Sequence, residues 1–150
     1  MLELDEQWSF VSYKANDIWL WLAICRRTLQ VVGHAVGKRT IETCRRLWAS
    51  IPPAYRQKRC FTDFWQAYAV VVPARLHRPT DNGDGQTCHI ERFNNTLRQR
   101  LGRLIRKTLS FSKCERMHEI CIRLFLWRYN TERAQAYLKQ VSNQNKANQQ

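Results

Sequence analysis

Three acidic residues of this basic chain lie where the sequence pattern allows them to act together. Asp5 lies among apolar residues in a predicted strand, Asp63 directly follows the short apolar segment 60–62, and Glu91 begins a long basic helix. Converging carboxylates repel one another unless a cation lies between them, and hard oxygen ligands favour Mg²⁺ or Mn²⁺. Two such ions, about 3.5 to 4 Å apart, support in-line displacement at phosphorus. We therefore predict a site with two Mg²⁺ or Mn²⁺ ions, in which these three residues are both metal ligands and catalytic residues.

Two of these acids also have an ordinary structural interpretation. Asp63 is well placed to cap a helix that follows a strand. Glu91 is well placed in a first helical turn, where a negative charge interacts favourably with the helix dipole. Their joint placement with Asp5 in a strand, beside an arginine-rich surface, favours the metal site over these interpretations.

The elements around the first two acids are predicted to form a mixed sheet. Three apolar segments rich in strand-forming residues follow one another with short polar connections, which predicts an antiparallel meander: 2–11, 18–25 and 29–36. Thr40 can cap a helix that ends before Pro52, and the segment 60–62 then forms a fourth strand parallel to the first. If the first and fourth strands are adjacent, the ends of these strands bring Asp5 and Asp63 to one point.

The second half of the chain is predicted to be a loop followed by helices. Residues 73–88 hold two prolines and two glycines, which indicates a loop. Apolar residues at helical spacing then predict one helix over about 89–105 and another over about 112–130. The segment 139–150 consists almost entirely of polar residues and cannot bury a core. We therefore expect one folded domain at 1–138 and a disordered tail at 139–150.

The composition points to a polyanionic partner. The chain has 150 residues with 25 Lys and Arg against 12 Asp and Glu, a formal net charge of +13. A basic structural protein, such as a ribosomal one, is the alternative, but six tryptophans and isolated acids are unusual there. No glycine-rich nucleotide-binding motif is present, so a nucleotide cofactor has no support. The longest apolar run, 18–25, is too short to span a bilayer, and we expect a soluble intracellular protein.

Several basic residues are candidates for DNA binding. Arg98 is seven residues from Glu91 and shares its helix face, which places it near a phosphate at the metal site. Five others are predicted to follow the DNA backbone without reading its sequence: Arg92, Arg100, Arg103, Arg106 and Lys107. A solvated basic face is the alternative for any one of them.

Aromatic and histidine residues near the acids have two interpretations. Trp65 and Tyr68 could stack on an extruded base, although aromatic residues at helical spacing more often belong to the core. His77 and His89 could orient a phosphate or a water molecule. For a lone histidine we favour a structural or surface role.

Four ordered motifs resemble the InsB half of the insertion-sequence-one transposases, and the resemblance extends over about residues 4–130. The motifs are DEQWSFV at 5–11, TDFWQAY at 62–68, IERFN at 90–94 and RKTLSFSK at 106–113. The resemblance implies a DDE transposase with an RNase H-like α/β fold, in which three antiparallel strands, a helix and parallel strands form a mixed sheet flanked by helices. It also matches Asp5, Asp63 and Glu91 to the catalytic triad of that family.

The resemblance implies partners as well. It predicts binding to the DNA of the element ends and of the target, a homo-oligomer on DNA, and a location in the bacterial cytoplasm at the nucleoid. It also implies that related full-length enzymes carry a zinc-ribbon and helix-turn-helix segment before this domain. Two positions depart from the family pattern: Ser12 replaces an expected glycine, and the stretch 77–91 lacks a lysine that many relatives have.

The function predicted from these features is metal-dependent DNA strand cleavage and strand transfer during the transposition of an insertion sequence. Two alternatives remain at this point. One is an RNase H-like nuclease without strand transfer, and the other is a DNA-binding transposase remnant that has lost its chemistry.

Overall fold

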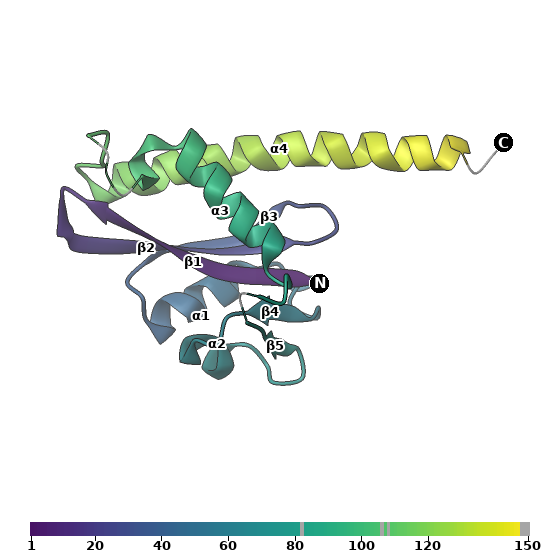
Figure 1. Cartoon of the computed structure of the whole chain (residues 1–150), viewed down its shortest axis with the longest axis horizontal. Helices are drawn as coiled ribbons and strands as arrows, with labels where there is room; N and C mark the ends of the chain where they lie inside the picture. Colours follow the sequence, from purple (N-terminus) through teal and green to yellow (C-terminus); the bar gives the residue numbers. More distant parts are fainter. Residues whose placement is uncertain (82, 106, 108, 148–150) are drawn as a thin grey trace.

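One mixed sheet organises the chain in the computed structural model, which describes residues 1–81, 83–105, 107 and 109–147 (Figure 1). Among these residues the sheet has five strands in the order β3-β2-β1-β4-β5. The strands are β1 (Leu2–Val11), β2 (Tyr13–Cys25), β3 (Val31–Gly37), β4 (Cys60–Thr62) and β5 (His77–Pro79). The first three pair antiparallel, whereas β4 pairs parallel with β1 and β5 parallel with β4. The expected antiparallel meander and the parallel neighbour of the first strand are both confirmed.

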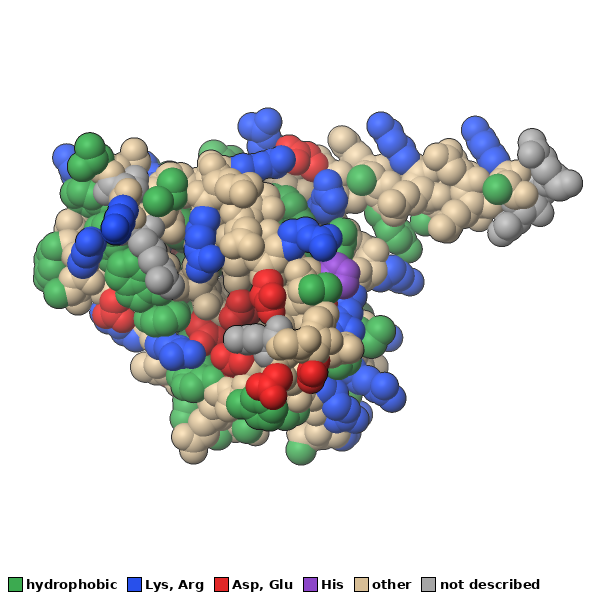
Figure 2. Space-filling model, viewed as in Figure 1, with side chains coloured by type: hydrophobic (Ala, Val, Ile, Leu, Met, Phe, Trp, Pro, Cys, Tyr) green, Lys and Arg blue, Asp and Glu red, His purple; other side chains and the backbone are tan. Residues whose placement is uncertain are grey.

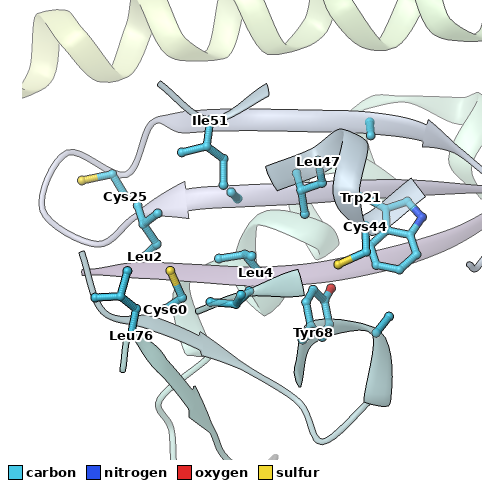
Figure 3. Close-up of a cluster of buried hydrophobic side chains, with 14 residues drawn as sticks. Leu2, Leu4, Trp21, Cys25, Cys44, Leu47, Ile51, Cys60, Tyr68 and Leu76 are labelled. Carbon is cyan, nitrogen blue, oxygen red and sulfur yellow. The ribbon is translucent and has the colours of Figure 1, made fainter. Parts of the chain in front are cut away.

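Helices cover both faces of the sheet. On one face lie α1 (Ile41–Ser50) and α2 (Gln66–Val71), and on the other lie α3 (Cys88–Arg100), the 3-10 helix η1 (Gly102–Leu104) and α4 (Glu115–Ala147) (Figure 1). Each layer has its own apolar core. The first core joins residues of β1, β2 and α1, including Leu4, Trp21 and Leu47 (Figure 3), and the second joins Leu20, Phe93 and Ile122. This arrangement agrees with an RNase H-like fold.

The alternation of side chains along β1 decides which residues face α3. Leu2 and Leu4 are fully buried in the core beneath α1 and α2. Because successive residues of a strand point to opposite faces, Glu3 and Asp5 point toward α3. Burying two acidic side chains on one face of a strand costs free energy unless these side chains have hydrogen-bond donors or positive charges as partners.

Local signals place the first helix where the sequence predicts it. Thr40 caps α1 by accepting a hydrogen bond from the Thr43 backbone N–H at 3.4 Å, and Pro52 follows its end. The helix lies close to β3 because Gly33 has no side chain there. A Cβ atom at position 33 would lie 2.6 Å from Cγ1 of Ile51.

The helix predicted over 89–105 ends earlier than its apolar spacing suggests. α3 stops at Arg100, Leu101 is extended with φ −120° and ψ 91°, and η1 follows. Gly102 disfavours helix continuation, and the turn allows Leu104 to be buried at 1% exposure. Arg103 therefore lies on η1 and not on the same helix as Arg98, which corrects the sequence-based expectation.

The last helix is longer than predicted and begins later. Ser112 is not helical, because its backbone carbonyl accepts a hydrogen bond from the Ser12 N–H at 2.7 Å beside the end of β1. α4 starts at Glu115 and continues to Ala147. Residues 139–147, expected to be disordered, are thus helical, as the continuation of a helix whose earlier residues are packed against the sheet. The domain boundary at 138 stays a prediction.

A short strand lies within the segment that the sequence predicts to be a loop. The segment 73–88, expected as a loop, contains β5, whose three residues end at Pro79 at the edge of the sheet.

Ser12, which replaces the expected glycine, has φ 65°, in the left-handed region that favours glycine. The local backbone therefore has the shape that the family pattern implies, with a serine in it.

Candidate active site

The three predicted acids line a single cavity of about 280 Å³, together with Leu4 and Thr87. Asp5 comes from the middle of β1, Asp63 from the residue after β4, and Glu91 from the first turn of α3. Acidic side chains gather near the middle of one face of the molecule, with Lys and Arg side chains around them (Figure 2). The convergence predicted from the sequence is present in the structure.

Strand register explains why the two aspartates meet. β1 and β4 pair Leu2 with Cys60 and Glu3 with Phe61, so paired residue numbers differ by 58. Asp5 and Asp63 differ by the same 58. Continuing the register therefore brings them side by side just beyond the end of β4, where the chain leaves the sheet.

Each carboxylate is held by hydrogen-bond donors of the protein. Asp5 accepts from the Glu6 backbone N–H at 2.8 Å and from Asn94 Nδ2 at 2.6 Å. Asp63 accepts from the Trp65 N–H at 3.0 Å. Glu91 accepts from Thr87 Oγ1 at 2.6 Å. These contacts orient the acids and keep them from approaching one another freely.

The electrostatic environment of Asp5 is strongly unfavourable to an isolated negative charge. Burial, together with the smaller effects of the nearby charges of Glu6, Asp63 and Glu91, raises the pKa of Asp5 to about 7 against the lowering effect of the Glu6 N–H bond. Among the described residues that line the cavity, none is basic. The cavity thus lacks a positive charge of its own, which is the condition in which carboxylates attract a cation.

Glu6 belongs to a different environment on the opposite face of β1. Its carboxylate accepts from Tyr68 Oη at 2.6 Å and pairs with Arg39 Nη2 at 2.7 Å. The Arg39 guanidinium lies against the rings of Trp19 and Trp65, at 4.9 and 4.7 Å from their centroids. Burial raises the pKa of Glu6, whereas the bonds from Tyr68 and Arg39 lower it. Glu6 therefore has its own protein partners on the opposite face and does not line the cavity.

The donor set fits hard divalent ions. Three carboxylates from three elements, close enough to perturb Asp5 electrostatically, are the ligand type that Mg²⁺ and Mn²⁺ prefer. In the described part of the chain, no three His, Cys, Asp or Glu side chains already have the arrangement of a metal site. Each of the three carboxylates instead accepts a hydrogen bond from a protein donor.

The basic residues predicted from the sequence have different environments. Arg92 and Arg100 are exposed on α3, and Arg100 pairs with Glu132 of α4 at 3.7 Å. Arg98 is half-buried on the helix face of Glu91 and contacts Asn95 Oδ1 at 3.5 Å, but it does not line the cavity.

Two further candidates lie beyond α3, and one lies outside the described residues. Arg103 donates to Ser112 Oγ at 3.2 Å, so it helps to hold the segment between η1 and α4. Lys107 is exposed in a turn. Arg106 lies outside the residues that the structure describes.

The aromatic and histidine candidates are structural, as favoured from the sequence. Tyr68 is fully buried, and Trp65 packs against Trp21 with ring centroids 5.0 Å apart. His77 Nε2 lies 2.8 Å from Thr62 Oγ1, and His89 Nδ1 lies 2.7 Å from a Glu3 carboxylate oxygen.

Sequence reasoning missed Asn94 and Glu3, which contact the acid-bearing elements directly. Asn94 follows Glu91 by three residues and is therefore on its helix face, and Glu3 precedes Asp5 by two and shares its strand face. Both spacings are visible in the sequence and were the available signals.

Similarity to known proteins identifies the family of this chain. The family model described as IS1 transposase matches residues 1–131. The chain belongs to the IS1 transposase family. It is 44% identical over 124 residues to the iso-IS1n protein InsB of Shigella dysenteriae, covering 83% of this chain and 92% of that protein.

Other InsB proteins of the IS1 family are nearly as similar. The IS1 4 protein InsB of Escherichia coli (strain K12) is 39% identical over 124 residues, which cover 83% of this chain and 72% of that protein. The IS1 protein InsB of Shigella flexneri is also 39% identical, with 83% and 92% covered. The family resemblance expected from the four motifs is confirmed. In the described residues, no helix is both long and apolar enough to cross a membrane.

Proposed function

We propose that this IS1-family chain is the catalytic domain that cleaves DNA at the ends of an insertion sequence and joins the freed strand to target DNA. The observation that carries the proposal is the convergence of Asp5, Asp63 and Glu91 on one cavity in a protein of formal charge +13. Divalent ions held by these three residues would supply Lewis-acid stabilisation of charge on the reacting phosphate oxygens and would promote deprotonation of the attacking hydroxyl.

The reaction consists of two displacements at phosphorus. In the first, a water oxygen attacks the phosphorus at the element end, and the bond to the 3′-oxygen breaks, which leaves a 3′-hydroxyl and a 5′-phosphate. In the second, that 3′-hydroxyl attacks a phosphodiester of the target, forms a new phosphodiester bond and releases a target 3′-hydroxyl. Neither step requires a covalent intermediate with the protein.

The residues of the chain have separable tasks in this scheme. Asp5, Asp63 and Glu91 would hold the ions, whose positive charge would offset the repulsion between these carboxylates and the reacting phosphate. Asn94 and Thr87 orient two of these carboxylates through hydrogen bonds of 2.6 Å each. Exposed basic residues such as Arg92 and Lys107 attract the DNA backbone without reading its sequence. Arg106, which belongs to the same sequence-based prediction, is proposed for this task from its sequence position alone.

The proposal extends to partners through the family. The duplex DNA of element ends and target is the substrate, and a homo-oligomer on DNA brings the two element ends together. A zinc-ribbon and helix-turn-helix segment, as in related full-length enzymes, would read the end sequences. Recovery of an untagged copy with a tagged chain, with and without end DNA, tests the oligomer.

The first test replaces each acid by its amide. Asp5→Asn, Asp63→Asn and Glu91→Gln each remove a ligand charge with little change in volume, so each is expected to reduce strand cleavage at least 100-fold in Mn²⁺ or Mg²⁺ while the fold remains. Strand products are measured on labelled element-end DNA, and folding is measured by circular dichroism. Glu42→Gln on α1, whose carboxylate is exposed, is the matched control. Substantial cutting by any of the three variants would contradict the assignment.

The same assay separates the rival functions. A nuclease without strand transfer yields nicked DNA and no joined donor-target product. A remnant without chemistry yields neither, and calorimetric titration with Mn²⁺ then shows no heat that depends on the three carboxylates. Joined product that requires all three acids supports the transposase over both.

A further inference from the structure

Glu3 is another acid on β1, and it does not line the cavity. Its side chain is fully buried, with a relative exposure of 0%. It is two residues before Asp5 and therefore on the same face of β1, toward α3. Burying a carboxylate is costly unless it is paired and hydrogen-bonded, so its contacts define its purpose in the fold.

Glu3 caps the helix that carries Glu91. One carboxylate oxygen accepts from the backbone N–H groups of His89 at 3.0 Å and Ile90 at 2.9 Å, in the first turn of α3. The side chain of Thr87, at the N-cap position, makes no hydrogen bond to the helix backbone and instead donates to the Glu91 carboxylate. A strand residue thus supplies the cap that a local residue usually provides. Thr87 is thereby left to orient the Glu91 carboxylate.

Arg26, which directly follows β2, connects Glu3 to two other elements. Its Nε donates to Glu3 Oε1 at 2.7 Å. Its Nη2 donates to the backbone carbonyl of Gln86, and to the Gln86 side-chain oxygen at 3.1 Å, just before α3. Its guanidinium lies over the ring of Phe61 on β4, 3.8 Å from the centroid. Planar geometry and five donors suit arginine to contact three partners at once.

These contacts join the strand that carries Asp5 to the segments directly before Asp63 and Glu91. β1 carries Glu3 and Asp5, β4 carries Phe61 just before Asp63, and α3 begins after Gln86 and carries Glu91. We propose that Arg26 and Glu3 form a positioning pair that sets the relative placement of Asp5, Asp63 and Glu91. The effect on metal binding rests on the proposed function, whereas the effect on the geometry of α3 does not.

The pair differs from a salt bridge that only adds stability. Removal of a pair that only stabilises the protein lowers the midpoint of thermal unfolding and leaves the folded site unaltered. Removal of a positioning pair also changes the site in the folded protein, because loss of the cap releases the first turn of α3 from β1. Groups that orient metal ligands commonly alter metal affinity about 10- to 100-fold when they are removed.

The test uses two conservative variants of the full chain. Glu3→Gln keeps the side-chain shape but offers one acceptor oxygen, and it loses the charge that binds Arg26. Arg26→Lys keeps the charge but loses the planar fork. The control pair is Glu42→Gln and Arg45→Lys, which alter an exposed ion pair of 3.6 Å on α1. Amide hydrogen exchange at residues 88–92 and calorimetric Mn²⁺ affinity are measured at a temperature where every variant is folded.

Faster exchange at residues 88–92 and at least 10-fold weaker Mn²⁺ binding are expected for both test variants, and neither change for the controls. Unchanged exchange and unchanged Mn²⁺ affinity in folded Glu3→Gln and Arg26→Lys, with only a lower unfolding midpoint, would overturn the proposal. If Glu3→Gln does not fold, Arg26→Lys alone decides, because this side chain is partly exposed and its charge is kept. If the unaltered chain binds no Mn²⁺, the metal part of the proposed function fails, and the exchange measurement still decides whether the pair holds α3.

Discussion

Three acids on one strand have three different tasks, and the face and depth of each side chain decide which. Glu3 and Asp5 point toward α3, where Glu3 meets backbone N–H groups and Asp5 faces a cavity. Glu6 points to the other face, where it pairs with Arg39 and accepts a hydrogen bond from Tyr68. An acid with complete protein partners is structural, and an acid whose neighbours are other acids is available for a cation.

Arg98 is the basic residue whose direction agrees best with a task at the reacting phosphate. It lies on α3 with Glu91, and at about 100° per residue it is 20° short of two full turns from it. Arg98→Ala is expected to lower the single-turnover cleavage rate at saturating DNA about 10-fold. Arg92→Ala, on a different side of the same helix, is expected mainly to weaken DNA binding. Equal rate losses in the two variants would refute the distinction.

The buried His118 makes the fold sensitive to acid. Burial, and to a smaller extent the charge of Arg103, lowers the pKa of His118 to about 4, and its Nδ1 lies 2.8 Å from Ser112 Oγ. The unfolded chain binds a proton near pH 6.5, whereas the folded chain resists it. Stability from the neutral ring is therefore complete above pH 6.5 and is lost as the pH falls through 4, by up to about 3 kcal/mol.

Comparison with His118→Asn isolates this contribution from the carboxylates that titrate in the same range. The free energy of unfolding of the unaltered chain is expected to fall more steeply between pH 6.5 and 4 than that of the variant. Chemical denaturation at several pH values measures both. Parallel curves would show that His118 does not contribute.

At the scale of elements, α4 is attached to the sheet over only part of its length. Asn130 pairs with the edge strand β3 by accepting from the Val31 N–H at 2.8 Å and donating to the Val31 carbonyl at 2.8 Å. Farther along, Tyr137 still faces Arg27, 5.8 Å from the guanidinium carbon to the ring centroid. Beyond this point α4 projects away from the sheet (Figure 1).

Truncation tests the predicted domain boundary on this helix. Removal of residues 139–150 is expected to change the free energy of unfolding by less than about 1 kcal/mol, because none of the described residues 139–147 is buried. Truncation after Tyr129 is the contrasting variant, since it removes Asn130 and leaves the backbone groups of Val31 without their partner. Thermal unfolding measures both. A large loss of unfolding free energy on removal of residues 139–150 alone would show that this segment belongs to the folded domain.

At the scale of the molecule, an acidic cavity lies within a basic surface. The formal net charge is +13, and Lys and Arg side chains surround the acidic group on the face shown (Figure 2). Under the proposed function, such a surface would attract the DNA backbone over distances set by the ionic strength, whereas the cavity would repel phosphate until cations are bound.

This charge distribution predicts DNA binding with steep salt dependence and little sequence preference. Each neutralised phosphate releases counterions, so the logarithm of the binding constant falls with the logarithm of salt concentration by about 0.9 per contact. Fluorescence anisotropy measures binding to end-sequence and scrambled duplexes at salt concentrations from about 50 to about 200 mM. The comparison gives both the salt dependence and the sequence preference. Arg92→Ala is expected to reduce the slope by about 1. Selective, tight and salt-insensitive binding to one sequence would contradict this prediction.

Much of the fold and the three acids could be predicted from the sequence because the signals are local. Strand-forming segments, the cap at Thr40, the stop at Pro52 and the four motifs are properties of neighbouring residues, and they indicate element order and family. The difference in residue number between Asp5 and Asp63 equals the offset between paired residues of β1 and β4. Only the observed pairing of these strands shows that the two numbers agree.

Tertiary structure alone decided the features that depend on contacts between distant residues. α3 ends at Arg100 because Leu104 is buried after a turn at Gly102, although the apolar spacing continues. The bond from Arg26 to Glu3 joins residues 23 positions apart, and the cap from Glu3 to Ile90 joins residues 87 apart. Burial by such distant residues also raises the pKa of Asp5, and no local pattern specifies how much solvent the completed fold removes from one carboxylate.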